Sequence, residues 1–161
     1  MKTMSTTDMA QLTKLLARFG LQLVQVDNDS PIPGSFWGAP ESGLINDQLF
    51  FCADTPLHSV LHEACHYICM DDERRQALHT NAGGDYAEED GVCYLQILLA
   101  EFLSDSSSHA LCQEMDAWGY TFRLGSARAW FENDAEDAHD WLLEKTIITA
   151  DGQPTWQLRQ G

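Results

Sequence analysis

Residues 62–66 read His62-Glu63-Ala64-Cys65-His66, a run whose residue types and spacing are suited to binding a metal ion. Side chains four positions apart in a helix lie one turn apart on the same face, so His62 and His66 can hold one ion together. Glu63 follows the first ligand and can reach a water molecule bound to that ion. The run therefore predicts a metal site with Glu63 as its catalytic residue. The alternative is a helix with two ordinary histidines.

The flanking sequence predicts that this run lies on a buried helix. A short apolar segment, residues 49–52, reads as a strand. A helix over Pro56–Met70 follows, with Thr55 as its N-cap and the proline at its first position. Apolar residues surround the two histidines, which indicates that the helix is buried. His58 extends the histidine run by one turn, and we interpret it as a residue near the mouth of a cleft and not as a ligand.

A catalytic metal site of this kind requires a third protein ligand and an open coordination position. Acidic residues within 85–90 open a second apolar helix, residues 91–103. Asp85 and Glu88 fit a capping box, which would engage Glu88 at the start of the helix. Glu89 is then free to point along the buried face, so we predict Glu89 as the third ligand, with Glu88 in reserve. Acids that only complement the helix dipole are the alternative, which explains the cluster less well because an apolar helix follows.

Two histidines and one carboxylate do not determine which metal is bound. With Zn²⁺, this ligand set activates water for hydrolysis, and Glu63 is the general base. The same set is the facial triad that binds Fe²⁺ and leaves positions for dioxygen. The residues therefore leave a hydrolase and an oxygenase open, and the expected cofactor is one divalent metal ion, Fe²⁺ or Zn²⁺.

The segment Ser59–Tyr67, followed by the pair Arg74-Arg75, resembles the core of the bacterial elongation factor P hydroxylase family. That family carries a serine three residues before the motif, an aromatic residue directly after it and an arginine pair at this offset. Residues 27–33 and the strand at 49–52 also resemble its N-terminal half, so the likeness covers roughly residues 20–100. The family acts on a modified lysine of elongation factor P.

The resemblance implies a protein-modifying oxygenase in which His62, His66 and Glu89 bind the metal. The chain also departs from the family pattern, because Val92 and Cys93 stand where the family has a proline and a glutamine. The connection before the third ligand is shorter than the aromatic-rich one of the family. These departures affect the identity of the substrate more than metal binding, so a zinc metallopeptidase remains the alternative. A third class, a protein that keeps the fold but has lost the metal or the base, is opposed by the intact His62, Glu63 and His66.

Composition limits the partners of the chain. The 161 residues include 25 acidic and nine basic side chains, with a net charge of −16, whereas nucleic acid binding needs a basic face. The sequence has no transmembrane run or signal peptide, and its five cysteines lack zinc-finger spacing. We therefore expect a cytoplasmic protein with reduced thiols, acting on a protein or peptide, without nucleic acid or membrane partners.

The remaining periodicity predicts a small number of further elements. They are a helix over residues 8–19, a strand over 21–26, a loop over 27–43, a helix over 106–118, one or two helices within 126–147, and a short strand or coil after 151. The expected fold is one α+β domain over residues 1–161, with a small sheet packed against metal-bearing helices, as in zincin-like enzymes.

Aromatic residues divide into two groups by their place in the sequence. Phe36, Trp37 and Tyr67 lie near the presumed cleft and are suited to lining a substrate groove. The remaining tryptophans are expected to fill the C-terminal part of the core. They are Trp118, Trp130, Trp141 and Trp156.

Overall fold

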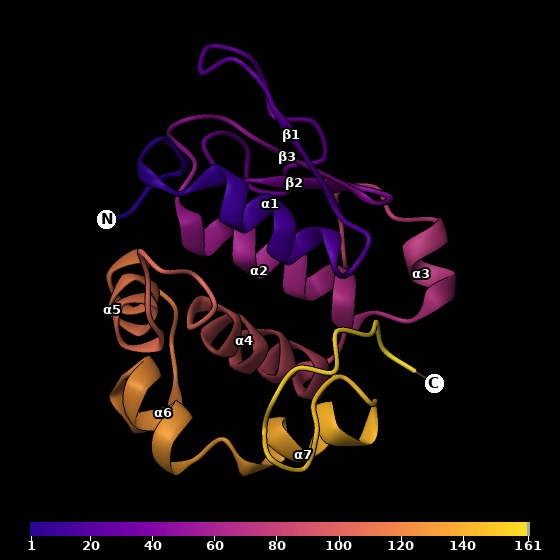
Figure 1. Ribbon diagram of the computed structural model, residues 1–161, viewed down its shortest axis with the longest axis vertical. Helices are drawn as coiled ribbons and strands as arrows, with labels where there is room; N and C mark the ends of the chain where they lie inside the picture. The colour runs from indigo at the N-terminus through magenta and orange to yellow at the C-terminus, as the bar shows by residue number, and fades with distance from the viewer. Residues whose placement is uncertain (161) are drawn as a thin grey trace.

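The computed structural model describes residues 1–160, and these form an α+β fold with seven α-helices and one three-stranded sheet (Figure 1). In Figure 1 the sheet and the first helix lie above the helix that carries the histidines. A second long helix, residues 86–100, lies below it with the helix at 108–118 to its left, and the last two helices form the lowest layer. The expected fold class, a small sheet with helices, is confirmed at this level.

The sheet contains β1 (Gln22–Gln25), β2 (Gly43–Ile45) and β3 (Gln48–Phe51) in the order β1-β3-β2. The central strand β3 is parallel to β1 and antiparallel to β2. Leu49 and Phe51 of β3 are buried and point into the core below the sheet. Strand β2 was not among the elements expected from the sequence, because three residues are too few to produce a readable alternation.

The outer edge of β2 is covered by a segment of the connection that follows the histidine helix. The backbone N–H of Thr80 donates to the carbonyl of Leu44 at 3.0 Å, and the N–H of Asn46 donates to Leu78 at 2.9 Å. Ile45 and His79 form an isolated antiparallel bridge between these contacts. Residues 78–80 therefore occupy the edge of the sheet on this side.

Helix α2 (Leu57–Cys69) carries the motif and lies between the sheet and helix α4 (Tyr86–Ala100). The helix begins one residue later than expected, because Pro56 has extended backbone angles and occupies the N-cap position. Thr55 does not cap the helix, since its hydroxyl accepts a hydrogen bond from the N–H of Cys52 and closes the preceding turn. The expected N-cap was therefore wrong by one position.

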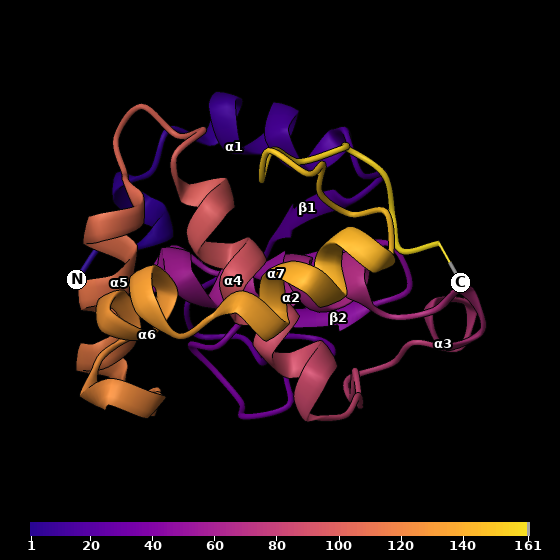
Figure 2. The same cartoon turned by 90° about the horizontal axis from the view of Figure 1, so that it is seen from below.

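Helix α4 is enclosed by its neighbours along most of its length, so its acidic first turn is fixed beside α2. Asp85 caps the helix by accepting a hydrogen bond from the N–H of Glu88 at 2.9 Å. Gly91 permits close approach of helix α7, because a Cβ at this position would lie 2.8 Å from the ring of Trp141. Figure 1 shows α4 between α2 above and α7 below, and in Figure 2, seen from below, α7 crosses in front of α4.

The other elements complete the layers around these two helices. They are the 3₁₀ turns Met4–Thr6 and Arg123–Gly125 and the helices α1 (Met9–Ala17), α3 (Asp72–Gln76), α5 (Ser108–Trp118), α6 (Ala127–Asn133) and α7 (Glu136–Glu144). The region expected to hold one or two helices forms two, and α3 was not expected. After residue 151 the structure contains no strand within the described residues, only an isolated bridge between Ile148 and Pro154.

Two further expectations concern cysteines and membranes. All five cysteines lie within the described residues, and each is buried and unpaired. Among residues 1–160, every helix is too short or too polar to cross a membrane.

Candidate metal centre

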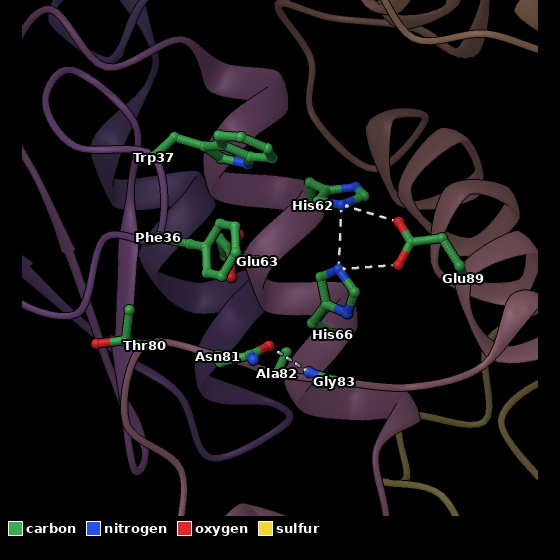
Figure 3. A pocket seen from close by; sticks show the side chains of 10 residues that line it. All are labelled: Phe36, Trp37, His62, Glu63, His66, Thr80, Asn81, Ala82, Gly83 and Glu89. Atoms are coloured by element: carbon green, nitrogen blue, oxygen red, sulfur yellow. Dashed lines mark hydrogen bonds and ion pairs between the residues drawn. The ribbon is translucent and has the colours of Figure 1, made fainter.

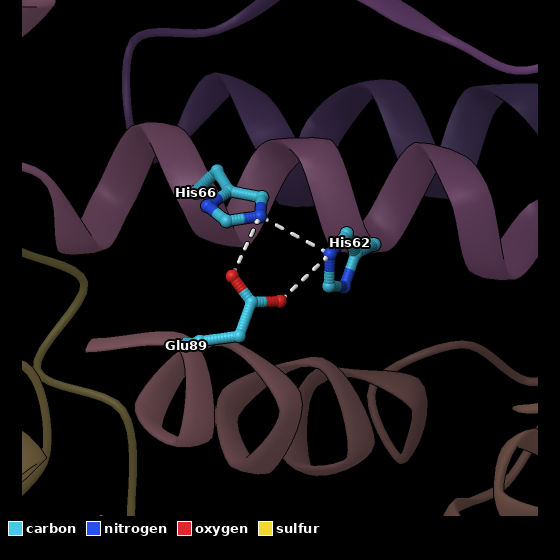
Figure 4. A group of neighbouring side chains, drawn as sticks. All are labelled: His62, His66 and Glu89. Atoms are coloured by element: carbon cyan, nitrogen blue, oxygen red, sulfur yellow. Dashed lines mark hydrogen bonds and ion pairs between the residues drawn. The ribbon is translucent and has the colours of Figure 1, made fainter. Parts of the chain in front are cut away.

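The side chains of His62, His66 and Glu89 converge between α2 and α4 (Figure 4). The two imidazole Nε2 atoms lie 3.1 Å apart. The carboxylate of Glu89 reaches across from α4, with Oε1 at 3.2 Å from Nε2 of His62 and Oε2 at 3.3 Å from Nε2 of His66. The structure thus brings together the three residues that the sequence analysis selected as ligands.

These separations fit the donor set of a divalent ion. Donor atoms bound at about 2.0–2.1 Å lie about 3.3 Å apart in a tetrahedral site and about 3.0 Å apart on an octahedral face. The 3.1 Å between the two Nε2 atoms falls in this range, and each Nε2 has a carboxylate oxygen of Glu89 at 3.2 or 3.3 Å, these two contacts being made by different oxygens. The donor set therefore suits both Zn²⁺ and Fe²⁺, and its geometry does not choose between them.

Gln96 of helix α4 fixes the orientation of His62. Its side-chain amide donates to the carbonyl of His58 at 2.8 Å, so its oxygen faces Nδ1 of His62 at 2.9 Å. With a metal bound, His62 would keep its proton on Nδ1 and present the lone pair of Nε2 to the ion, as metal-binding histidines do. His66 has no such partner among the described residues, since its Nδ1 is buried without a hydrogen bond. Its ring is held by packing and by the contacts of Nε2 with His62 and Glu89.

The electrostatics of the metal-free site give His66 and Glu89, but not His62, the protonation states that metal binding needs. Burial alone would lower the pKa of His62, but Tyr120, Cys93 and Glu89 raise that pKa well above its ordinary value, so a bound ion would displace a proton from this ring. Burial lowers the pKa of His66 to about 4, so its imidazole is neutral at pH 7. Burial alone would raise the pKa of Glu89, but the hydrogen bond to His62 and the charges of both histidines hold that pKa below its ordinary value. A neutral imidazole and an ionised carboxylate are the ligand forms.

Glu88, the reserve candidate, is held elsewhere in the structure. Its carboxylate receives hydrogen bonds from the guanidinium groups of Arg74 and Arg159, and Glu88 is only 3% exposed. Asp85 caps the helix as expected, but Glu88 does not return to complete the capping box, because these arginines engage it. Glu89 is thus the residue of the acidic turn that faces the histidines.

Glu63 lies at the junction of two adjoining cavities that open beside the triad (Figure 3). Burial raises the pKa of its carboxyl group to about 7, so this group can both accept and release a proton near neutral pH. The cavities have volumes of about 330 and 530 Å³ and share Trp37, His62, Glu63 and Glu89. Together they form one groove that crosses the triad.

The two arms of the groove differ in chemistry. The smaller arm has a wall formed by residues 80–83, which belong to the segment leaving the sheet edge. The larger arm has aromatic walls from Trp37, Trp118 and Tyr120, together with the carboxylate of Glu41. Trp37 is 78% exposed and stands over the groove from the 27–43 loop (Figure 3).

The aromatic residues expected to contact the cleft or the core are only partly placed as predicted. Phe36 and Trp37 line the groove, whereas Tyr67 lines a different surface cavity. The prediction for Trp118 as a core residue was wrong, because Trp118 is 44% exposed and lines the larger arm. Trp130 is buried as expected, while Trp141 and Trp156 are partly buried against the core.

His58 was expected near the cleft mouth, but the structure buries it completely. Its ring packs against Trp118 and Tyr120, and its Nδ1 lies 3.3 Å from the phenol oxygen of Tyr120. His58 therefore supports the aromatic wall of the groove and is not part of the triad. Sequence reasoning assigned no role to Gln96, Tyr120 or Glu41, since nothing in their local sequence marks them as neighbours of residues 62–66.

Comparisons of the chain with protein-family models, curated proteins and solved structures give no match.

Proposed function

We propose that this protein is a metal-dependent enzyme that acts on a protein or peptide. His62, His66 and Glu89 would hold one divalent ion, and Glu63 would transfer protons in the groove beside it. The proposal rests on one observation: donor atoms of two histidines and one glutamate, all within 4.8 Å of one another, meet at the junction of two cavities where the carboxyl group of Glu63 also lies. A buried structural site would have no reason to open onto such a groove.

Each residue around the centre would have a defined task. His62 and His66 bind through Nε2, and Gln96 keeps the first of these rings in the binding tautomer. A bound Zn²⁺ ion lowers the pKa of water and polarises a carbonyl group, whereas Fe²⁺ with the same ligand set supports reaction with dioxygen. Trp37 would cover a bound substrate segment and exclude water from the junction.

Hydroxylation of a protein side chain is our first candidate reaction, and it is supported by the resemblance to the elongation factor P hydroxylases. Two of the residues that carry the resemblance lie near the centre. Ser59 lines the larger arm, and Arg74 holds Glu88, the neighbour of the third ligand. Two others, Tyr67 and Arg75, line a separate surface cavity.

The sheet edge also favours this candidate over a peptidase that binds its substrate by strand addition. An extended peptide commonly adds to an exposed sheet edge through main-chain hydrogen bonds. The edge of β2 is already paired with residues 78–80, as the bonds from Thr80 to Leu44 and from Asn46 to Leu78 demonstrate. A peptide would have to enter the groove by other contacts.

Zinc-dependent hydrolysis is the second candidate, and the position of Glu63 supports it. In that reaction Glu63 would accept a proton from the attacking water and pass it to the leaving nitrogen. A pKa of about 7 suits both halves of this transfer. The zincin-like arrangement of the helices and sheet belongs to this proposal, as does a cytoplasmic location, which the five unpaired buried thiols support.

One experiment separates the two candidates. Metal-free protein would be loaded under anaerobic conditions with Fe²⁺ or with Zn²⁺. It would then be offered oxygen, a reductant and modified elongation factor P, or alternatively an unstructured basic peptide. Oxygen consumption with addition of one oxygen atom to the protein substrate supports hydroxylation. Peptide cleavage by the Zn²⁺ form without oxygen supports hydrolysis instead. Failure to bind either metal stoichiometrically would contradict both.

A further inference from the structure

Arg159 contacts both helices that carry the presumed ligands. Its backbone N–H donates to the carbonyl of Ile68 at 2.9 Å, and its Nη1 donates to the carbonyl of Cys69 at 3.3 Å, both at the end of α2. The same Nη1 lies 3.0 Å from Oε1 of Glu88 in the first turn of α4. One side chain from the C-terminal tail therefore joins the last turn of α2 to the first turn of α4, and Figure 1 shows the tail in this place.

Arg74 completes the arrangement from the other side. Its guanidinium group donates to both carboxylate oxygens of Glu88, and its Nη1 also donates to the carbonyl of Ala82 at 3.1 Å. Gly84 leaves the space that this carboxylate needs, because a Cβ there would lie 2.4 Å from Oε2 of Glu88. Gly84 also has a φ of +102°, which side chains rarely adopt. The segment before α4 thus leaves room for the carboxylate of Glu88 and for the arginine that binds it.

We propose that Arg74, Glu88 and Arg159 form a positioning clamp for the metal centre. The clamp fixes the first turn of α4, and with it Glu89, opposite His66. Helix ends fray when nothing holds them, so a ligand in the first turn needs an external support. This inference rests on the proposed metal site, since the clamp has no role in catalysis without it.

The charges of the clamp indicate that it fixes the position of α4 and does not mainly stabilise the fold. Glu88 is nearly fully buried and pairs with two arginines, and Arg74 also pairs with Asp71, so the two positive and two negative charges balance. Apolar residues of similar volume often replace such a buried group without loss of stability, because the charges no longer have to be desolvated. Directed hydrogen bonds, however, fix the position of α4 in a way that apolar packing does not.

The test uses a triple variant, Arg74→Met, Glu88→Leu and Arg159→Met, titrated with Co²⁺ in place of the native ion. Circular dichroism and thermal unfolding of the metal-free protein report whether the fold persists. We expect a folded protein whose Co²⁺ affinity falls by about 10–100-fold, with an altered visible spectrum of the bound ion. Unchanged affinity and spectrum would overturn the clamp. Arg128→Met, which removes an exposed arginine paired only at the surface, is the matched control.

Arg159→Lys serves if the triple variant does not fold. It keeps the charge but cannot donate to Cys69 and Glu88 with the same geometry, so we expect a smaller loss of affinity and a spectral change. Affinity and spectrum equal to those of the native protein would again overturn the clamp. His62→Ala separates this failure from failure of the metal site. If the native protein binds no Co²⁺, or His62→Ala binds it equally well, the metal site itself is wrong.

Discussion

The side-chain oxygen of Gln96 lies 2.9 Å from Nδ1 of His62, which ties a buried residue of α4 to the first histidine of the motif. Gln96 is fully buried, and its amide nitrogen also satisfies the carbonyl of His58. One side chain thus sets the tautomer of a ligand and satisfies a buried backbone group. Two residues 34 positions apart in the sequence act as a unit.

Replacing Gln96 with Met should weaken metal binding and destabilise the protein. The variant keeps the volume but leaves Nδ1 of His62 without its partner and removes the additional hydrogen bond to the carbonyl of His58. We expect metal affinity to fall by about 10–100-fold and the free energy of unfolding to fall by about 1–3 kcal/mol. A competition titration with a chelating dye and urea unfolding would measure the two effects. Gln113→Met, at an exposed glutamine, should change neither, and an unaffected Gln96 variant would refute the orienting role.

His62→Ala should abolish stoichiometric metal binding, because two of the three presumed ligands cannot hold a divalent ion tightly. His58→Ala should retain one metal per chain, since His58 packs against aromatic rings and is not in the triad. Elemental analysis of both variants, purified without added metal or chelator, gives the comparison. Full metal occupancy in His62→Ala, or loss of metal in His58→Ala, would show that these residues do not have the roles assigned to them.

Glu63→Gln should keep the metal and lose activity. The amide matches the carboxyl group in shape but cannot accept a proton, and general acid–base catalysis contributes about 10²–10⁴-fold. Metal content would be measured together with turnover of the substrate, modified elongation factor P or a basic peptide, on which the native protein proves active. Glu73→Gln, at an exposed position on α3, is the control. Activity within a factor of ten of the native protein would exclude Glu63 as the proton-transfer group.

The metal-free protein should lose stability as the pH falls from 6.5 towards 4, in part through His58. Burial lowers the pKa of His58 from 6.5 to about 4 in the folded state. In that window the unfolded chain binds a proton at His58 that the folded chain does not, so acid favours unfolding, and above pH 6.5 the effect vanishes. For His58→Gln we expect a smaller drop in unfolding free energy between pH 7 and 4.5, by about 2–3 kcal/mol. Urea unfolding of both proteins at the two pH values would measure these drops. Equal drops in the native protein and in His58→Gln would exclude His58 as a source of the acid sensitivity.

The helical parts of the site follow from local sequence. Apolar residues around the histidines predicted the buried helix α2, and the acidic run before an apolar segment predicted the start of α4. Glu89 was preferred to Glu88 because a capping box was expected to engage Glu88. Glu89 is the residue that meets the histidines in the structure, although arginines engage Glu88 in place of the capping box. These inferences succeeded because they depend on contacts within one or two helical turns.

The parts that were not predicted depend on contacts between distant segments. Glu88 was assigned to a capping box, but its partners Arg74 and Arg159 lie 14 and 71 residues away. Trp118 was assigned to the core, yet tertiary packing places it on the wall of the groove. No local sequence pattern predicts such contacts, because they form only when the helices and the C-terminal tail pack together.

Trp37 also gives the molecule an optical signal of its own. Its indole is largely exposed to water and lines both arms of the groove, so any ligand in either arm would cover it. The emission of an indole shifts to shorter wavelength when water is removed from its surroundings. Titration of candidate substrates can therefore be followed by intrinsic fluorescence without a label, with Trp37→Phe identifying the share of the signal that comes from Trp37 and not from Trp118, which lines the larger arm.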